Sequence, residues 1–558
     1  MPRTRTFAVA ILAAALLVPP VSAAGPQPRA NDPVWGAALD AARIPGGEYA
    51  VLRAAYEERA GLLWMDDGAP SPQAIALAAL IARAGERGLS ADDYGGTAPA
   101  LHIASAAGSS VSERAAIDVA FSSVVLAFVS DLGLGRVHPQ EARWHLAAVR
   151  SELPLAKLIA GLAAASDVDA ELDAIEMPLA IHVRTRLALA LYRALAERGE
   201  GPPLHAWKRT IAPGDASAGL DALAARLDLL GDLPAGTVIP ARYEGPLVVA
   251  VQQFQERHGF TADGLIDRGT YQALAVPLAR RVQQLSLSLE RMRWIPRHLA
   301  SPLIVVNIPE FALHAVSTSG RPGLDMKVVV GRSHDHRTPM FVDDVQAVQF
   351  HPYWNVPANI AKDQLLNRLL AHPANALAQG FELVERDGKV RAWPADAQSR
   401  SRGGAGPLRL RQRPGPLNAL GPVKLEMPNP YAIYLHGTPS QGLFAREKRD
   451  FSHGCIRVED PSALATWALL ETPGWSEERV HAAIAAGESL RVPLTTPIHV
   501  LILYTTTVVG EDGRVSFYDD VYGNDAVLEK SIEHASAARR ARAMSAATFA
   551  SDARTASR

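Results

Sequence analysis

The sequence contains very little cysteine: Cys455 is the single one in 558 residues. An intramolecular disulfide is therefore excluded, and a cysteine-rich zinc site is excluded as well. The chain also lacks an excess of either charge, because 56 Lys and Arg residues against 58 Asp and Glu residues give a net charge of −2. Such a balance offers no basic surface to DNA or RNA, so we expect no nucleic-acid partner.

We also expect no hydrophobic run long enough to span a membrane, either near the N-terminus or later in the chain. The N-terminal apolar stretch covers residues 7–18, whereas a membrane-spanning helix takes about twenty apolar residues. It follows Arg3 and Arg5 and precedes Val21-Ser22-Ala23, which is the layout of a signal peptide cleaved after Ala23. We therefore expect residues 1–23 to direct export to the periplasm, with no membrane span in the mature chain. Retention of this segment as an anchor is the alternative.

The single cysteine follows two histidines in the chain. His453 lies two residues before Cys455, and His436 ends the run 431–436, whose alternating residues are typical of a β-strand. Thiolate is the attacking form of cysteine, and a free thiol titrates near ~8.5, so a nucleophile needs an imidazole that accepts its proton. A strand holds a side chain rigidly, and we predict that His436 is this base. The Gly454-Cys455 turn can direct backbone N–H groups at an oxyanion.

These residues form a recognisable pattern, His-Gly-Thr at 436–438 followed by Ser-His-Gly-Cys-Ile-Arg at 452–457. It resembles the signature of the L,D-transpeptidase (YkuD) catalytic domain, found in enzymes that cross-link bacterial peptidoglycan. The resemblance implies that Cys455 is the nucleophile, that His436 is the general base, and that the Gly437 carbonyl orients His436. It also implies that the other motif residues shape the oxyanion hole and the substrate contacts: Ser452, His453, Gly454 and Arg457. We add three candidates for substrate binding: Tyr434, Trp354 and Asn355.

The resemblance implies an acyl transfer that needs no cofactor and no metal. A thioester on the cysteine would pass a donor stem peptide to the side-chain amine of a second stem, forming 3→3 cross-links in cell wall biogenesis, with a part in cell shape. The expected partners are peptidoglycan stem peptides and, as inhibitors, carbapenems. We expect the protein to be a monomer.

Three alternatives stay open at this point. A thiol hydrolase, either an L,D-carboxypeptidase or an enzyme that detaches wall-bound protein, would use the same site with water as the acceptor. A non-catalytic wall-binding scaffold would need neither the cysteine nor the histidine. A metal site is the third alternative, because His334, His336 and His351 lie in one short region.

Changes in residue pattern divide the chain into domains of a multidomain α+β protein. Alanine- and leucine-rich segments with helical spacing come first, and strand-like runs such as 303–307 and 326–331 follow. The order is similar to that of the large YcbB-type L,D-transpeptidases. We expect a helical scaffold domain at 30–205, a three-helix peptidoglycan-binding-like domain at 215–280, a mostly β catalytic domain at 300–530 with a helical capping insertion at 357–406, and a disordered tail at 535–558.

Overall fold

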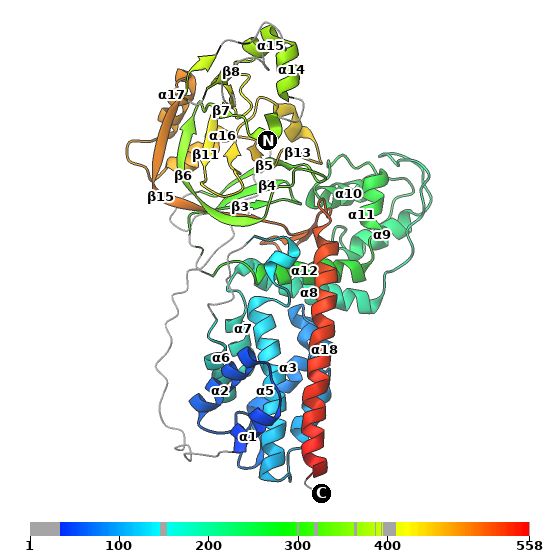
Figure 1. Ribbon diagram of the computed structural model, residues 1–558. Helices are drawn as coiled ribbons and strands as arrows, with labels where there is room; N and C mark the ends of the chain where they lie inside the picture. Colours follow the sequence, from blue (N-terminus) through cyan, green and yellow to red (C-terminus); the bar gives the residue numbers. More distant parts are fainter. Residues whose placement is uncertain are drawn as a thin grey trace. The chain divides into compact units, whose positions relative to one another are not determined.

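The computed structural model of the chain describes residues 34–145, 153–297, 299, 301–316, 322–361, 365–385, 387–391, 393 and 409–556. The predicted signal peptide, residues 1–23, lies outside the described residues, and so does part of the predicted insertion at 357–406. The described residues form two compact units, so the protein is multidomain α+β (Figure 1). The β-rich unit comprises 299–504 with 519–522. The helical unit comprises the described residues before 299 together with 505–518 and the chain from 523 onward.

The helical unit begins with a bundle in the region predicted to be a scaffold. Its α-helices are α1 (Val34–Ala41), α2 (Gly46–Arg59), α3 (Pro72–Ala82), α4 (Ala98–Ala104), α5 (Val111–Leu134), α6 (Leu155–Ala164), α7 (Val168–Ile175) and α8 (Ala180–Arg198). A short hairpin of β1 (Met65–Asp66) and β2 (Ala69–Pro70) interrupts them. Helix α5 is the centre of the bundle, because most of its residues are buried. It starts with a capping box in which Ser110 and Glu113 bind each other's backbone N–H groups.

Helix α5 is also the one described helix that is long and apolar enough to cross a membrane. In this fold 83% of its most apolar window is buried by the surrounding helices, as in the core helix of a globular bundle. The carboxylate of Asp118 on α5 accepts hydrogen bonds from the Tyr56 hydroxyl at 2.7 Å and from the Trp64 N–H at 2.8 Å. A buried carboxylate with such partners is satisfied, so α5 holds together segments distant in the sequence.

A second core in the helical unit gathers α9 (Leu220–Leu229), α10 (Pro246–Arg257) and α11 (Arg268–Leu274) around Tyr243, Leu247 and Phe254. The region expected to be a three-helix module thus contains three helices, and its binding of peptidoglycan stays a prediction. Helix α12 (Leu278–Met292) follows it. The hairpin β16 (Thr507–Val509) and β17 (Val515–Phe517) belongs to the helical unit as well. The predicted bounds of the catalytic domain, 300–530, would have included this hairpin.

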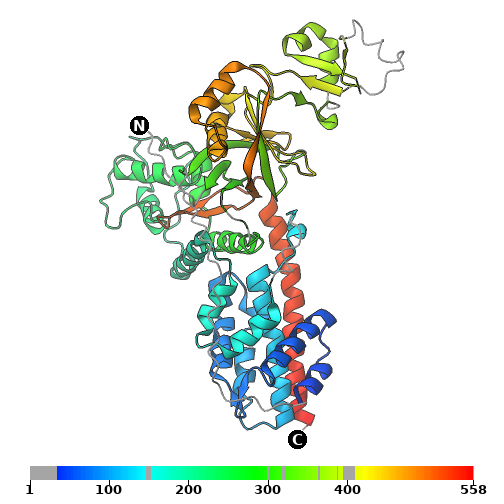
Figure 2. The same cartoon turned by 90° about the vertical axis from the view of Figure 1, so that its left-hand side faces the viewer.

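The predicted disordered tail is wrong, because helix α18 runs from Asn524 to Ala556. Figures 1 and 2 show it alongside α5. Small alanines allow a close approach, and Ala543 and Ala550 are buried. Arginines on α18 also find carboxylates in the bundle, as Arg539 does with Asp131. The apolar face of this helix consists largely of alanine and is therefore narrow. For this reason the sequence pattern did not indicate a packed helix at 535–558.

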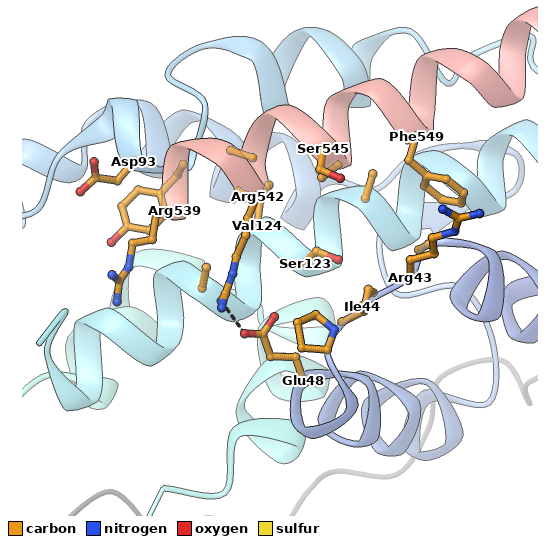
Figure 3. A pocket seen from close by; sticks show the side chains of 17 residues that line it. Arg43, Ile44, Glu48, Asp93, Ser123, Val124, Arg539, Arg542, Ser545 and Phe549 are labelled. Carbon is orange, nitrogen blue, oxygen red and sulfur yellow. Dashed lines mark hydrogen bonds and ion pairs between the residues drawn. The ribbon is translucent and has the colours of Figure 1, made fainter. Parts of the chain in front are cut away.

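A cavity of about 100 Å³ lies beside α18 in the helical unit (Figure 3). Side chains of α18, α5 and the start of α2 surround it. Arg542 pairs with Glu48 at 2.5 Å, and Phe549 and Val124 supply apolar surface. The helix is thus docked by ion pairs and by apolar contacts together.

The β-rich unit is built on one large sheet. Its strands run in the order β13-β5-β14-β12-β11-β6-β15-β3-β4, and β4 also pairs with β5, so the sheet closes on itself. Fully buried β-branched side chains such as Ile304, Val345 and Ile456 fill it. The bounds are β3 (Leu303–Asn307), β4 (Ala312–Val316), β5 (Leu324–Gly331), β6 (Phe341–Phe350), β11 (Val423–Glu426), β12 (Leu435–His436), β13 (Asp450–Ser452), β14 (Ile456–Val458) and β15 (Leu490–Leu503). Helices α16 (Pro461–Leu469) and α17 (Glu477–Ala486) precede β15.

A small subdomain is inserted between β6 and β11, visible at one side of the large sheet in Figures 1 and 2. The insertion was expected to be helical, but its centre is a second sheet in the order β7-β10-β8-β9. Phe381 and Leu383 on this sheet bury their side chains against Leu369 and Ala376, and this core requires strands as well as helices. The elements are β7 (Trp354–Asn355), α13 (Ala358–Ile360), α14 (Leu366–Ala371), α15 (Pro373–Ala378), β8 (Phe381–Val384), β9 (Val390–Arg391) and β10 (Arg409–Gln412).

Candidate functional site

The strand that carries His436 is shorter than the sequence pattern suggested. Strand β12 holds only Leu435 and His436, and it lies between antiparallel β11 and parallel β14. The preceding residues form a turn that the side chain of Asn429 stabilises. Its Oδ1 accepts from the Ile433 N–H at 3.1 Å, and its Nδ2 donates to the Ile433 carbonyl at 2.7 Å. Ala432 has a φ of 55°, which a strand does not allow. His436 is nevertheless fixed, because β12 has neighbours on both sides.

The ring of His436 has a defined orientation. Its Nδ1 lies 2.5 Å from the carbonyl oxygen of Gly437. A carbonyl can only accept, so Nδ1 carries the proton and donates it. The lone pair is then on Nε2, which is the ring nitrogen able to accept a proton. This geometry agrees with the orienting role predicted for Gly437.

The loop that carries Cys455 connects β13 to β14 and places the thiol next to β12. Gly454 has a φ of 111°, a conformation that favours glycine. The hydroxyl of Ser452 accepts from the Gly454 N–H at 3.1 Å and donates to the Cys455 carbonyl at 2.6 Å. The Gly454 N–H was one of the two predicted oxyanion donors, and here it is engaged. The Cys455 N–H has no acceptor among the described residues.

Cys455 and His436 line one open cavity of about 860 Å³, to which both the β-rich domain and the inserted subdomain contribute residues. Of the predicted residues, Ser452, His453, Arg457, Tyr434 and Trp354 line it too. Asn355 does not, because it is exposed on β7 where it pairs with β10. The inserted subdomain contributes further lining residues: Pro357, Ile360, Leu365, Asn367, Arg368, Gln379, Phe381 and Gln412.

Burial controls the protonation of the thiol and the imidazole. It raises the pKa of the Cys455 thiol above the ordinary value of 9.0, against the opposing effect of Lys424 and Arg457. It also lowers the pKa of His436 from 6.5 to about 3, and the positive charge of Arg457 acts in the same direction. Both groups are therefore neutral at pH 7. A neutral thiol reacts as a nucleophile only when a base takes its proton, and a neutral imidazole is chemically suited to that role without a preformed ion pair.

His453 is held on the other side of the loop. Its ring lies 4.5 Å from that of His336, centroid to centroid, and Arg332 Nη2 donates to its Nε2 at 3.4 Å. With Nε2 engaged, His453 is a poorer proton acceptor than His436. The alternative of a metal site at His334, His336 and His351 is not supported either, because the His351 Nε2 lies 2.7 Å from the Ile484 carbonyl. Within the described residues, no group of three His, Cys, Asp or Glu side chains could hold a metal ion.

Two cationic residues near the cavity were missed in the sequence. Lys424 on β11 pairs with His436 across the strands, and its ammonium lies 4.3 Å from the centre of the Tyr434 ring. Sequence alone favours a surface position for Lys424, although its place between the buried Val423 and Leu425 in a strand pattern could have pointed to the site. Arg368 on α14 lines the cavity from the inserted subdomain, and no sequence signal distinguishes it from other exposed arginines.

The depressed pKa of His436 predicts a pH effect on stability. An unfolded histidine is protonated below about 6.5, whereas folded His436 stays neutral down to about 3. Its stabilising contribution is thus present above pH 6.5 and is lost as the pH falls toward 3, at no more than about 1.4 kcal/mol per pH unit. We expect the thermal midpoint of His436→Gln to fall less than that of the wild type between pH 7.5 and pH 5. His182 and His258, which also have lowered pKa values, are present in both proteins. Equal falls would contradict the neutral His436.

Comparison with known families covers both units. Residues 301–481 match the family described as the L,D-transpeptidase catalytic domain, YkuD. Residues 50–189 match the family described as the scaffold domain. The first match contains His436 and Cys455, and the second begins within α2 and ends within α8.

Individual relatives were found as well. A curated protein of Haemophilus influenzae, whose name places it among L,D-transpeptidases, is 34% identical over 243 residues, 44% of this chain and 48% of that protein. The chain thus spans about half the length of this relative. The crystal structure of an L,D-transpeptidase from Xylanimonas cellulosilytica matches at 15% identity, over 54% of this chain and 100% of that one. The crystal structure of an L,D-transpeptidase from Stackebrandtia nassauensis matches at 13% identity, over 54% of this chain and 97% of that one. Their TM-scores are 0.18 and 0.19, and likenesses this weak carry no argument about the site.

Proposed function

Because the chain belongs to the YcbB type of the YkuD family of L,D-transpeptidases, we propose that it joins peptidoglycan stem peptides by 3→3 cross-links through a thioester on Cys455. The observation that carries this proposal is the shared cavity, which is lined by one thiol and by one neutral, oriented imidazole. Muropeptides digested from peptidoglycan that was incubated with the purified protein test it. Mass spectrometry should find new cross-linked dimers, and their absence would contradict the proposal.

The proposed reaction has two halves, both of which use His436. The Cys455 Sγ attacks the carbonyl that precedes the terminal D-residue of the donor while its proton moves to His436 Nε2. The bond from that carbonyl to the D-residue nitrogen then breaks, and His436 returns the proton to the leaving amine. In the second half, the acceptor amine attacks the thioester and gives a proton through His436 to the departing sulfur. The thiol and the neutral imidazole are restored.

The charge of the cavity supports a peptide substrate with free carboxylates. Arg457 on β14 and Arg368 on α14 of the inserted subdomain both line it. Among the cavity's described lining residues there is no Asp or Glu. Two guanidinium groups without an acidic neighbour attract anionic groups, and their planar donors suit carboxylates.

We also propose that the protein acts in the periplasm after export by residues 1–23, and that residues 215–280 contact peptidoglycan. The signal-peptide layout of the first residues supports the first point, and the helical module supports the second. Cell fractionation followed by N-terminal sequencing checks the location, and sedimentation of the protein with purified sacculi checks the contact.

The inserted subdomain is proposed to act as a lid that keeps water from the thioester. Replacing residues 357–406 by a short glycine linker leaves β7 and β10 in place but removes Leu365, Arg368 and Phe381 from the cavity. Water then competes with the acceptor amine, so the ratio of cross-linked to hydrolysed product should fall more than the rate of acylation by a small carbapenem. Muropeptide analysis measures the ratio.

A point variant separates the exclusion of water by the subdomain from the attraction of the donor by its positive charge. Arg368→Ala keeps the lid and removes one cation, so we expect weaker donor binding with an unchanged product ratio. A deletion variant that cross-links and hydrolyses in the wild-type ratio would show that the subdomain is not a lid. A hydrolytic wild type would favour the carboxypeptidase alternative.

A further inference from the structure

A buried threonine contacts the back of the loop that carries the nucleophile. Thr338, in the segment between β5 and β6, is 2% exposed. Its Oγ1 lies 2.7 Å from the Gly454 carbonyl oxygen and 2.9 Å from the Gly331 backbone nitrogen. The carbonyl can only accept and the N–H can only donate, so the threonine proton goes to Gly454. The hydroxyl therefore links strand β5 to the cysteine loop with both of its hydrogen-bonding roles used.

The Gly454 carbonyl belongs to the peptide group whose N–H is that of Cys455. A peptide group is planar, and in the trans form its C=O and N–H point in opposite directions. Holding the oxygen on Thr338 thus sets the direction of the Cys455 N–H. This control matters here because glycine, at a φ of 111°, resists rotation less than other residues do.

The Cys455 N–H is also the donor that the loop leaves available. Ser452 already accepts from the Gly454 N–H, whereas the Cys455 N–H has no acceptor among the residues that the structure describes. A preoriented backbone N–H next to the attacking sulfur is the group that stabilises an oxyanion during acyl transfer.

Thr338 is itself held by a residue from a distant part of the chain. The hydroxyl of Tyr522 donates to the Gly331 carbonyl at 2.5 Å and accepts from the Thr338 N–H at 3.2 Å. Tyr522 is 3% exposed, and the Arg337 guanidinium lies 5.5 Å from its ring centre. Segment 519–522 belongs to the same compact unit as the site. A satisfied network of this kind is rigid, so the threonine hydroxyl has a fixed position.

We propose that Thr338 is a positioning residue for the oxyanion hole: its hydroxyl holds the Gly454–Cys455 peptide so that the Cys455 N–H faces the developing oxyanion. The inference rests on the proposed acyl transfer at Cys455. It assigns Thr338 no contact with substrate, and it gives Tyr522 the supporting role of fixing the threonine.

Two reactions of the same thiol distinguish this role from simple support of the fold. Acylation by a carbapenem builds an oxyanion, whereas alkylation by iodoacetamide forms a C–S bond and releases iodide without one. Thr338→Val keeps the shape and removes the hydroxyl. We expect acylation to slow by about 10- to 100-fold, since one donor is misdirected rather than deleted, while alkylation changes less than about twofold. Thr338→Ser retains the hydroxyl and should restore acylation.

A second variant covers the case in which Thr338→Val does not fold. Tyr522→Phe leaves Thr338 in place but removes its support, so it should slow acylation by a smaller factor and again spare alkylation. Unchanged acylation in the valine variant, or equal losses in acylation and alkylation, would overturn the positioning role. Failure of the wild type to be acylated at all would overturn the proposed function instead.

Discussion

Cys455→Ala should lose acylation completely while keeping its fold. Cys455 is the only cysteine in the chain, so the variant has no thiol that could form a thioester. The side chain is half-buried and small, and alanine fills nearly the same space, so we expect the fold to persist although the contact of the thiol with the Ala432 carbonyl at 3.6 Å is lost. We expect no mass increase on incubation with a carbapenem, whereas the wild type gains one inhibitor per chain. Intact-protein mass spectrometry gives the result directly.

The control for this experiment is a thermal unfolding curve of both proteins, which should nearly coincide. Cys455→Ser is a second control, because it keeps a hydroxyl beside His436 that is a much weaker nucleophile than the thiol. An inhibitor adduct on Cys455→Ala would mean that another residue is acylated, and the assignment of the nucleophile would be wrong.

His436→Ala should slow acylation by at least about 10²-fold, the usual effect of losing a general base. The reason is the protonation state of the site: the buried thiol has a raised pKa and does not ionise by itself at pH 7. We propose that the neutral imidazole, oriented by the Gly437 carbonyl, takes the proton. Stopped-flow measurement of carbapenem acylation at pH 7 provides the rate.

His453→Ala is the matched control, since both histidines line the same cavity. Its Nε2 is already engaged by Arg332, so this variant should retain acylation within a few-fold of wild type. At pH values above the raised pKa of Cys455, the thiolate forms without help, and the defect of His436→Ala should shrink. If His453→Ala is the slow variant and His436→Ala is near wild type, the two roles are exchanged.

The motif around Cys455 could be predicted well from sequence because its chemistry depends on neighbours along the chain. The Gly437 carbonyl, one position after His436, orients its ring, and the Ser452 hydroxyl donates to the carbonyl of Cys455, three positions later. Contacts between distant segments leave no such local pattern. The hydroxyl of Thr338 donates to the carbonyl of Gly454, 116 positions away in the sequence, and the residues around each of them give no sign of this contact.

The errors in the predicted fold have related causes. The tail was expected to be disordered because its apolar face is made of alanine, yet close packing on α5 and an ion pair such as Arg539–Asp131 stabilise it as α18. The inserted subdomain was expected to be helical because its strands are short. The strand predicted at 431–436 begins only at Leu435, because the hydrogen bonds of Asn429 and the positive φ of Ala432 form a turn before it. The alternating sequence pattern does not reveal such a turn.

We propose above all that Cys455 carries the donor as a thioester and delivers it to an amine. Its most direct test is intact-protein mass spectrometry with a stem-peptide donor and no acceptor, followed by addition of an amine-bearing acceptor stem. We predict a mass increase equal to the donor minus its terminal D-residue, located on the peptide that contains Cys455, and discharge of that mass into a cross-linked dimer once the acceptor is added. No adduct on Cys455, or an adduct that discharges only into hydrolysed donor, would contradict it.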